Sequence, residues 1–281
     1  MKLASFTSGT KSSYGIVVDD GIVDVGRRLG ARFSTLRDAV AGGGLDTITG
    51  YANNTPDVPL SDVKLLPPVP NPDKIVCIGL NYKEHAAEAG AEIPQFPALF
   101  VRLTNTLVGH ESPMILPKLS GDFDYEAELM IVIQKGGRHI KKEFALDHVL
   151  GYSCFNDGSI RDVQFKHSLA AGKNFPATGG FGPWITTKDE IPNPSALTVC
   201  TRINGKEVQR SGTDDLIFDV PSIIAYVSGF TPLEPGDVIA TGTPSGVGFA
   251  RKPPLWLKAG DIVEIEISKI GILRNPIVAE T

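Results

Sequence analysis

Short runs rich in β-branched and other apolar residues recur from residue 74 to the C-terminus, and few segments between them have helical periodicity. We expect strands at residues 74–78, 126–133, 148–154, 198–203, 237–241 and 261–267. Within this region, helices are expected only at residues 82–91, 144–149 and 220–229. The regular alternation of strand and helix that a doubly wound sheet needs is missing. The sequence therefore predicts an α+β fold that is mainly β with a few helices.

A small β-rich unit is expected at the N-terminus. Residues 15–25 contain two β-branched runs around Asp20 and Gly21, a pattern typical of a β-hairpin, and a short helix is expected at 33–40. The segment 66–72 holds four prolines, too many for a helix or a central strand. We place a domain boundary there, which predicts a small β-rich domain at residues 1–66 and a larger domain at residues 67–281.

The composition argues against several classes of partner. The formal net charge is -5 and the pI is about 5.6, so the chain lacks the basic character of proteins that gather nucleic acid. No apolar run is long enough for a signal peptide or a membrane span. We expect a cytoplasmic protein that binds neither nucleic acid nor membrane. Cys77, Cys154 and Cys200 lie far apart in apolar settings, which favours buried reduced thiols.

The most informative polar residues lead into a predicted strand. Because side chains alternate along a strand, Glu126 and Glu128 project from the same face. Two adjacent carboxylates repel each other unless a cation neutralises them, and a divalent metal ion is the simplest cation to do so. The alternative is an exposed edge strand with solvated acids.

A third carboxylate follows another predicted strand. Asp157 stands in an Asn-Asp-Gly sequence at the strand end, where scaffolds commonly present functional groups, although the same sequence is also typical of a turn or a helix cap. Three carboxylates would suit Mg²⁺ or Mn²⁺ better than zinc, which prefers nitrogen and sulfur ligands.

Other polar residues are candidates for acid–base chemistry and anion binding. His85 and Glu88 are three residues apart, so in a helix the glutamate can orient the imidazole. Arg161, Gln164 and Lys173 follow the Asp157 strand and could hold a carboxylate or an oxyanion, although each alone is more typical of the surface. The loop 242–248 is dense in Gly, Ser and Thr and could offer N–H groups to an anion, or be a plain turn.

Taken in order, these motifs resemble the catalytic domain of the fumarylacetoacetate hydrolase superfamily from about residue 66 to the C-terminus. The segments that carry the resemblance are 79–82 leading to His85, 124–128, 156–157 with 161–164, 172–173, 182–184 and 235–248. The resemblance implies a mixed β-sandwich and β-roll fold for this domain. Residues 174–181 depart from the continuation found in many members, and we expect them to lie beside the pocket.

The resemblance also implies roles for residues. Glu126, Glu128 and Asp157 would bind Mg²⁺ or Mn²⁺, and His85 with Glu88 would activate water. Further catalytic residues would be Lys173, Gln164 and Arg161. The substrate would be bound by Tyr82, Arg161, Lys173 and Thr243. Residues around 82–96 would form a lid over a small 2-oxo acid, and a homodimer is expected.

Several reactions remain open for such a site. The favoured one is hydrolysis of a C–C bond in an acylpyruvate such as fumarylpyruvate or maleylpyruvate, which releases pyruvate during aromatic catabolism. Decarboxylation of oxaloacetate and isomerisation or hydration of a 2-hydroxydienoate would pass through the same kind of enolate. A remote alternative is a metal-binding and 2-oxo acid-binding module without turnover.

Overall fold

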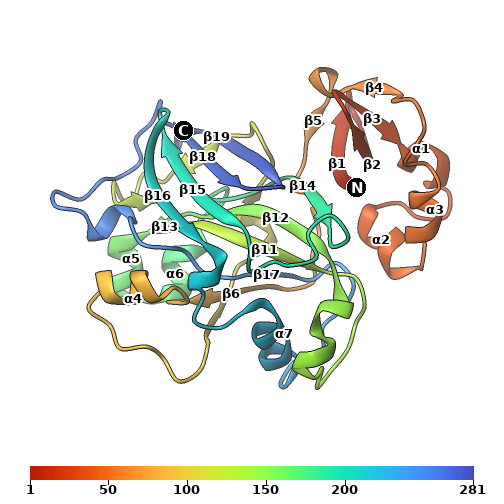
Figure 1. Cartoon of the computed structure of the whole chain (residues 1–281). Helices are drawn as coiled ribbons and strands as arrows, with labels where there is room; N and C mark the ends of the chain where they lie inside the picture. Colours follow the sequence, from red (N-terminus) through yellow and green to blue (C-terminus); the bar gives the residue numbers. More distant parts are fainter.

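A computed structural model describes all residues, 1–281, and confirms a fold that is mostly β with a few helices (Figure 1). The largest sheet has twelve strands. Its main path runs through β4 (Val58–Pro59), β3 (Gly21–Asp24), β2 (Lys11–Val18), β1 (Lys2–Ser8), β14 (Gly179–Thr187), β12 (Val149–Asp157), β11 (Ala127–Ile133), β17 (Val238–Ala240), β6 (Ile75–Gly79) and β7 (Ala98–Val101). Two short strands lie off this path, β5 (Lys64–Leu65) beside β1 and β8 (Leu107–Val108) beside β14.

A second sheet has five strands, in the order β16 (Lys206–Gly212), β15 (Thr198–Ile203), β18 (Ile262–Ile267), β19 (Gly271–Ala279) and β9 (Met114–Leu116). A short ladder joins β10 (Phe123–Asp124) to β13 (Ser159–Ile160). The largest hydrophobic cluster contains residues of both large sheets, such as Leu129 of β11 and Ile265 of β18. Met130 and Val132 belong to a second cluster, so β11 buries both of its faces, as expected of a central strand.

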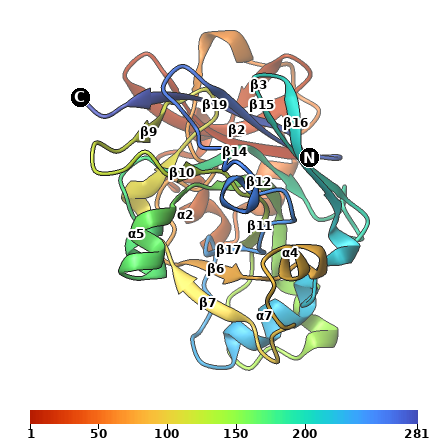
Figure 2. The same cartoon turned by 90° about the vertical axis from the view of Figure 1, so that its left-hand side faces the viewer.

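The helices are short. They are α1 (Val25–Leu29), α2 (Leu36–Ala41), α3 (Leu45–Thr49), α4 (Lys83–Glu88), α5 (Arg161–Lys166), α6 (Leu169–Lys173) and α7 (Val220–Ser228). Single 3₁₀ turns or short 3₁₀ segments are η1 (Leu60–Asp62), η2 (Thr104–Thr106), η3 (Lys142–His148), η4 (Thr213–Asp215) and η5 (Gly248–Ala250). No helix has both the length and the apolar character needed to cross a membrane. Figure 1 shows α4, α5 and α6 together on one side of β11 and β12, the side that faces the viewer in Figure 2.

The strands predicted from the sequence are all present within a few residues of their expected bounds. The helix expected at 82–91 ends at Glu88, before Gly90, whose φ of 64° favours glycine. The segment expected at 144–149 is the 3₁₀ segment η3. Helices α5 and α6 were not predicted. The three cysteines are buried and free, as expected.

The N-terminal unit joins the main sheet instead of standing apart from it. Strand β1 pairs antiparallel with β14, with Lys2 opposite Thr186 and Leu3 opposite Ile185. One hydrophobic cluster contains Leu3 and residues of β14 and β11. Figure 1 shows the unit, in red and orange, at the side of the larger sheet region. A boundary between residues 66 and 67 stays a prediction.

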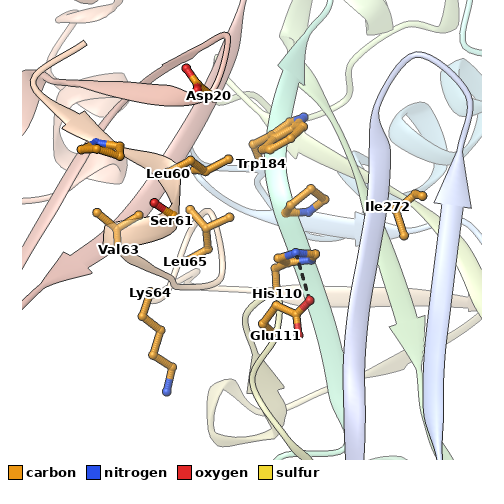
Figure 3. Close-up of a pocket in the computed structure, with 12 residues that line it drawn as sticks. Asp20, Leu60, Ser61, Val63, Lys64, Leu65, His110, Glu111, Trp184 and Ile272 are labelled. Carbon is orange, nitrogen blue, oxygen red and sulfur yellow. Dashed lines mark ion pairs between the residues drawn. The ribbon is translucent and has the colours of Figure 1, made fainter.

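A pocket of about 590 Å³ lies between the N-terminal unit and the larger region (Figure 3). Apolar side chains from both sides line it, including Leu60 and Trp184, together with His110 and Glu111. Nδ1 of His110 accepts a hydrogen bond from the backbone N–H of Arg274 at 3.1 Å. This contact favours a neutral imidazole with its proton on Nε2.

We expect His110 to make the protein less stable as the pH falls below neutrality. Burial lowers the pKa of His110 from its ordinary value of 6.5, and the nearby Glu111 only partly opposes this effect. As the pH falls through 6.5 towards the lowered pKa, the unfolded chain binds a proton before the folded chain does, so the free energy of unfolding decreases. His110→Asn keeps an acceptor for the Arg274 N–H and cannot titrate.

The measurement is urea unfolding at about pH 7.5 and about pH 5.5, which bracket the ordinary pKa of histidine. The difference in unfolding free energy between these pH values should be smaller in His110→Asn than in the parent chain. His167→Asn, at an exposed position, is the control. An unchanged pH dependence in His110→Asn would contradict the assignment.

A candidate metal centre beside an acid–base pair

Three buried carboxylates meet where β11 and β12 run antiparallel. The register sets Ala127 opposite Asn156, and the backbone N–H of Asp157 donates to the carbonyl oxygen of Glu126 at 2.9 Å. Glu126, Glu128 and Asp157 each offer an oxygen, and these oxygens lie within 4.8 Å of one another. Because β11 lies between β12 and β17, the alternative of a solvated edge strand is wrong.

Two cationic side chains contact Glu126 of this group. Nζ of Lys173 lies 2.7 Å from Oε2 of Glu126 and 2.5 Å from Oδ2 of Asp157. The guanidinium of Arg161 donates to Oε1 of Glu126 and, at 2.8 Å, to Oδ2 of Asp124. Burial works to raise the pKa of Glu126, but Lys173 and Arg161 outweigh burial and lower it. Glu126 is therefore ionised and balanced by protein cations.

Glu128 differs because no protein cation pairs with it. Its side chain is buried, and Oε2 accepts a hydrogen bond from the Gly242 N–H at 2.9 Å. Burial, and then the charges of Asp157 and Glu126, raise its pKa well above the ordinary value. A buried carboxylate without a counterion is costly, and a bound cation would remove that cost. The set of carboxylate oxygens thus fits a hard divalent cation.

A histidine–glutamate pair lies beside the carboxylates. On α4, Nδ1 of His85 is 3.2 Å from Oε2 of Glu88, and both residues are held on one helix face by their spacing. Both oxygens of Glu88 accept from the Gly246 N–H, at 3.0 and 3.1 Å. Since Nδ1 is occupied, Nε2 of His85 is the ring nitrogen that remains for a ligand or a proton.

A cavity of about 260 Å³ joins these groups. Its polar lining residues are His85, Glu126, Glu128, Arg161, Gln164, Lys173 and Thr243. Apolar residues complete the wall, namely Ile78, Leu80, Ala89, Ala98, Phe100, Leu169 and Phe249. Asp157 lies behind this lining as a fully buried member of the carboxylate group.

Most candidate residues from the sequence therefore converge on one place. Gln164 accepts a hydrogen bond from Arg161 at 3.0 Å, and the hydroxyl of Thr243 accepts one from Gln209, also at 3.0 Å. Tyr82 is the exception, because its side chain is fully buried and does not line the cavity. Its hydroxyl has no hydrogen-bond partner. Burial, and then the charge of Glu128, raise the pKa of this hydroxyl, and the expected role of Tyr82 in substrate binding stays a prediction.

The glycine-rich loop 242–248 holds the site's carboxylates by its backbone N–H groups. The pairs are Gly242 with Glu128, Gly246 with Glu88 and Gly248 with Asp124, at N···O distances of 2.9, 3.0 and 2.7 Å. Gly242 has a φ of 95°, and a Cβ there would lie 2.8 Å from the Asn81 side chain. The loop thus binds anionic side chains of its own chain.

Two functional candidates were missed by sequence reasoning. Asp124 accepts hydrogen bonds from Arg161 and from the backbone at Gly248, so it links the loop to the cationic side of the site. Arg102 is fully buried and contacts Asp157 at 2.5 Å. The sequence signal for Arg102 was its position as a single charged residue directly after the apolar run 98–101.

The chain is similar in sequence to known proteins. The family model described as fumarylacetoacetate (FAA) hydrolase C-terminal matches residues 74–278. A mitochondrial oxaloacetate tautomerase from Xenopus laevis is 44% identical over 221 residues, which cover 78% of this chain and 69% of the relative. The human mitochondrial oxaloacetate tautomerase FAHD2A is 41% identical over 230 residues, 81% of this chain and 73% of the relative.

A solved structure is similar over the whole length. The maleylpyruvate hydrolase from Sphingobium sp. SYK-6, in complex with manganese(II) ion and pyruvate, has a TM-score of 0.84 and 31% sequence identity. The similarity covers 100% of both chains, so it includes the N-terminal unit as well as the region that the family model matches.

Proposed function

This chain belongs to the fumarylacetoacetate hydrolase family, and from that premise we propose that it moves the C3 proton of a small 2-oxo acid, with oxaloacetate keto–enol tautomerisation as its reaction. The observation that carries the proposal is the position of His85. Its imidazole lines the same small cavity as Glu126 and Glu128, and Glu88 supports it from behind. The oxaloacetate tautomerases at 41–44% identity favour this reaction.

Glu126, Glu128 and Asp157 would hold the metal ion. A divalent cation supplies positive charge that lowers the cost of the negative charge developing on the 2-oxo group. The all-carboxylate ligand set favours Mg²⁺ or Mn²⁺. The manganese in the similar maleylpyruvate hydrolase supports this choice.

The protein's own residues transfer the proton and stabilise the charges of the substrate. In the keto-to-enol direction Nε2 of His85 accepts the proton from C3, Glu88 stabilises the imidazolium that forms, and the C2 oxygen takes a proton from solvent. In the reverse direction the enol oxygen gives its proton to solvent and His85 returns a proton to C3. Lys173 and Arg161 offer positive charge to the substrate carboxylate and to the C2 oxygen, and Gln164 and Thr243 donate hydrogen bonds from the cavity wall.

Hydrolysis of an acylpyruvate is the second candidate. The full-length similarity to a maleylpyruvate hydrolase favours it. In that reaction His85 would remove a proton from water, the resulting hydroxide would attack C4, and cleavage of the C3–C4 bond would release pyruvate and an acid. Decarboxylation of oxaloacetate and isomerisation of a 2-hydroxydienoate remain alternatives that differ in product.

We expect metal-dependent loss of the oxaloacetate enol absorbance at a rate above that of metal alone. The assay follows enol absorbance and pyruvate release in parallel, with Mg²⁺ or Mn²⁺, on oxaloacetate, maleylpyruvate, fumarylpyruvate and acetylpyruvate. EDTA should abolish the enzymatic rate because the carboxylate site then lacks its cation. Pyruvate release from the acylpyruvates without catalysed tautomerisation would favour hydrolysis. Inactivity on all four substrates would contradict both proposals.

A homodimer and a cytoplasmic location also stay predictions. Strand β7 is one edge of the main sheet, and Val101 at its end and Leu103 just beyond it expose 55% and 57% of their surface. An edge strand with exposed apolar side chains is a natural place for a second copy to pair.

A further inference from the structure

Arg102 lies behind the candidate metal site, on the side of Asp157 away from Lys173. Its side chain is fully buried, and it does not line the cavity. Nη1 donates to Oδ1 of Asp157 at 2.5 Å and to the carbonyl oxygen of Gly158 at 3.0 Å. The other carboxylate oxygen, Oδ2, lies 2.5 Å from Nζ of Lys173. The two oxygens of Asp157 therefore have separate partners, and Oδ2 is the one that shares the Lys173 ammonium with Glu126.

The guanidinium of Arg102 is held in one orientation. Nη2 donates to the hydroxyl of Thr178 at 2.8 Å, and Nε donates to the hydroxyl of Thr106 at 3.2 Å. Each hydroxyl gives its own hydrogen to a backbone carbonyl, Thr178 to Phe175 and Thr106 to Leu103, both at 2.7 Å. Because those hydrogens are committed, the lone pairs of both hydroxyls are available to Arg102.

The surrounding backbone leaves room for this arrangement. A Cβ at Gly179 would lie 3.1 Å from Nη2 of Arg102 and 3.3 Å from its Cζ, so a side chain there would crowd the guanidinium. The segment 174–181, which departs from many family members, supplies Thr178 and Gly179. It packs against Arg102 and does not line the cavity.

A planar guanidinium suits this task better than an ammonium group does. Arginine directs several donors in fixed directions, whereas lysine is a point charge on a flexible stem. Because Arg102 fixes one oxygen of Asp157, this side chain loses little conformational freedom when its other oxygen binds a cation.

We propose that Arg102 is the positioning residue for Asp157, and that it presents Oδ2 alone to the divalent cation. The inference rests on the metal site proposed above. It assigns no catalytic role to Arg102, which contacts neither the cavity nor its polar lining residues directly.

The test measures Mn²⁺ binding by isothermal titration calorimetry, together with the melting temperature of each metal-free variant. Arg102→Met should lower Mn²⁺ affinity about 10–100-fold, the range typical of residues that orient metal ligands. Arg102→Lys, which keeps the charge, should recover part of that loss. Thr178→Val removes one acceptor of Arg102 and should lower affinity about 3-fold. Arg202→Met, which breaks an ion pair with Glu266 outside the cavity, is the matched control and should bind Mn²⁺ like the parent chain.

The outcomes separate this inference from the proposed function. If the parent chain and a folded Arg102→Met variant bind Mn²⁺ equally, the inference is overturned and the metal site stands. If Arg102→Met does not fold, unchanged affinity in Thr178→Val overturns the inference, whereas reduced affinity at a normal melting temperature supports it. If the parent chain binds no Mn²⁺, the proposed metal site fails and this inference fails with it.

Discussion

Glu128→Gln is expected to abolish metal binding while leaving the metal-free protein as stable as the parent chain or slightly more stable. The parent Glu128 makes no direct ion pair, and burial with the charges of Asp157 and Glu126 raises its pKa despite the opposing charge of Lys173, so a neutral amide of the same shape removes an unfavourable charge. Gln can still accept from the Gly242 N–H. Affinity for Mn²⁺ and metal-dependent activity should each fall about 100-fold or more, because a ligand is lost. Calorimetry and thermal unfolding measure the two effects separately.

Glu126→Gln provides the contrast. This substitution also removes a metal ligand, but it takes one partner from each of two buried cations, Lys173 and Arg161. Each cation keeps one carboxylate, Asp157 or Asp124, so we expect a loss of about 2–3 kcal/mol of unfolding free energy, somewhat below the usual cost of breaking a buried pair. If Glu128→Gln and Glu126→Gln lower the unfolding free energy equally, protein cations balance the charge of Glu128 as they do that of Glu126, which would contradict our description.

His85→Ala should lower kcat for the metal-dependent reaction about 10²–10⁴-fold, the usual contribution of a general acid–base. The loss arises because no other imidazole lines the cavity. Mn²⁺ affinity should stay within about 3-fold of the parent value, because His85 is not one of the three carboxylate residues proposed to hold the metal. Steady-state kinetics at saturating metal, with the rate of metal alone subtracted, measure the effect.

Two variants sharpen this prediction. Glu88→Gln should cost less than His85→Ala, because the imidazole remains and only its partner's charge is lost. His167→Ala changes an exposed histidine at the end of α5 and should leave kcat unchanged. If His85→Ala turns over oxaloacetate at the parent rate, proton transfer by His85 is excluded.

The part of the site that could be predicted from the sequence depends on short-range geometry. The two-residue period of a strand sets Glu126 and Glu128 together, and the three-residue spacing on a helix sets His85 beside Glu88. Both patterns are visible within a few residues. The fold class was predictable for the same reason, since short β-branched runs mark strands locally.

The part that could not be predicted depends on long-range packing. Arg102 meets Asp157 across 55 residues of sequence, and no local pattern encodes that contact. Helices α5 and α6 have six and five residues, too few to show an amphipathic period, although they carry Arg161 and Lys173. Tyr82 immediately precedes α4, its backbone bridges to Leu216, and its side chain is fully buried and does not line the cavity. Sequence proximity to the motif did not determine its direction.

The glycine-rich loop has a consequence for how this site can diversify in evolution. Its N–H groups hold carboxylates at Glu128, Glu88 and Asp124, so an insertion in the loop would disturb the metal ligand, the acid–base pair and the Arg161 anchor together. Variation is tolerated more easily at the apolar lining residues such as Ala89, Phe100 and Leu169, whose side chains hold none of these carboxylates. New substrate ranges in related enzymes should therefore arise from changes in these lining residues, while the loop stays constant in length.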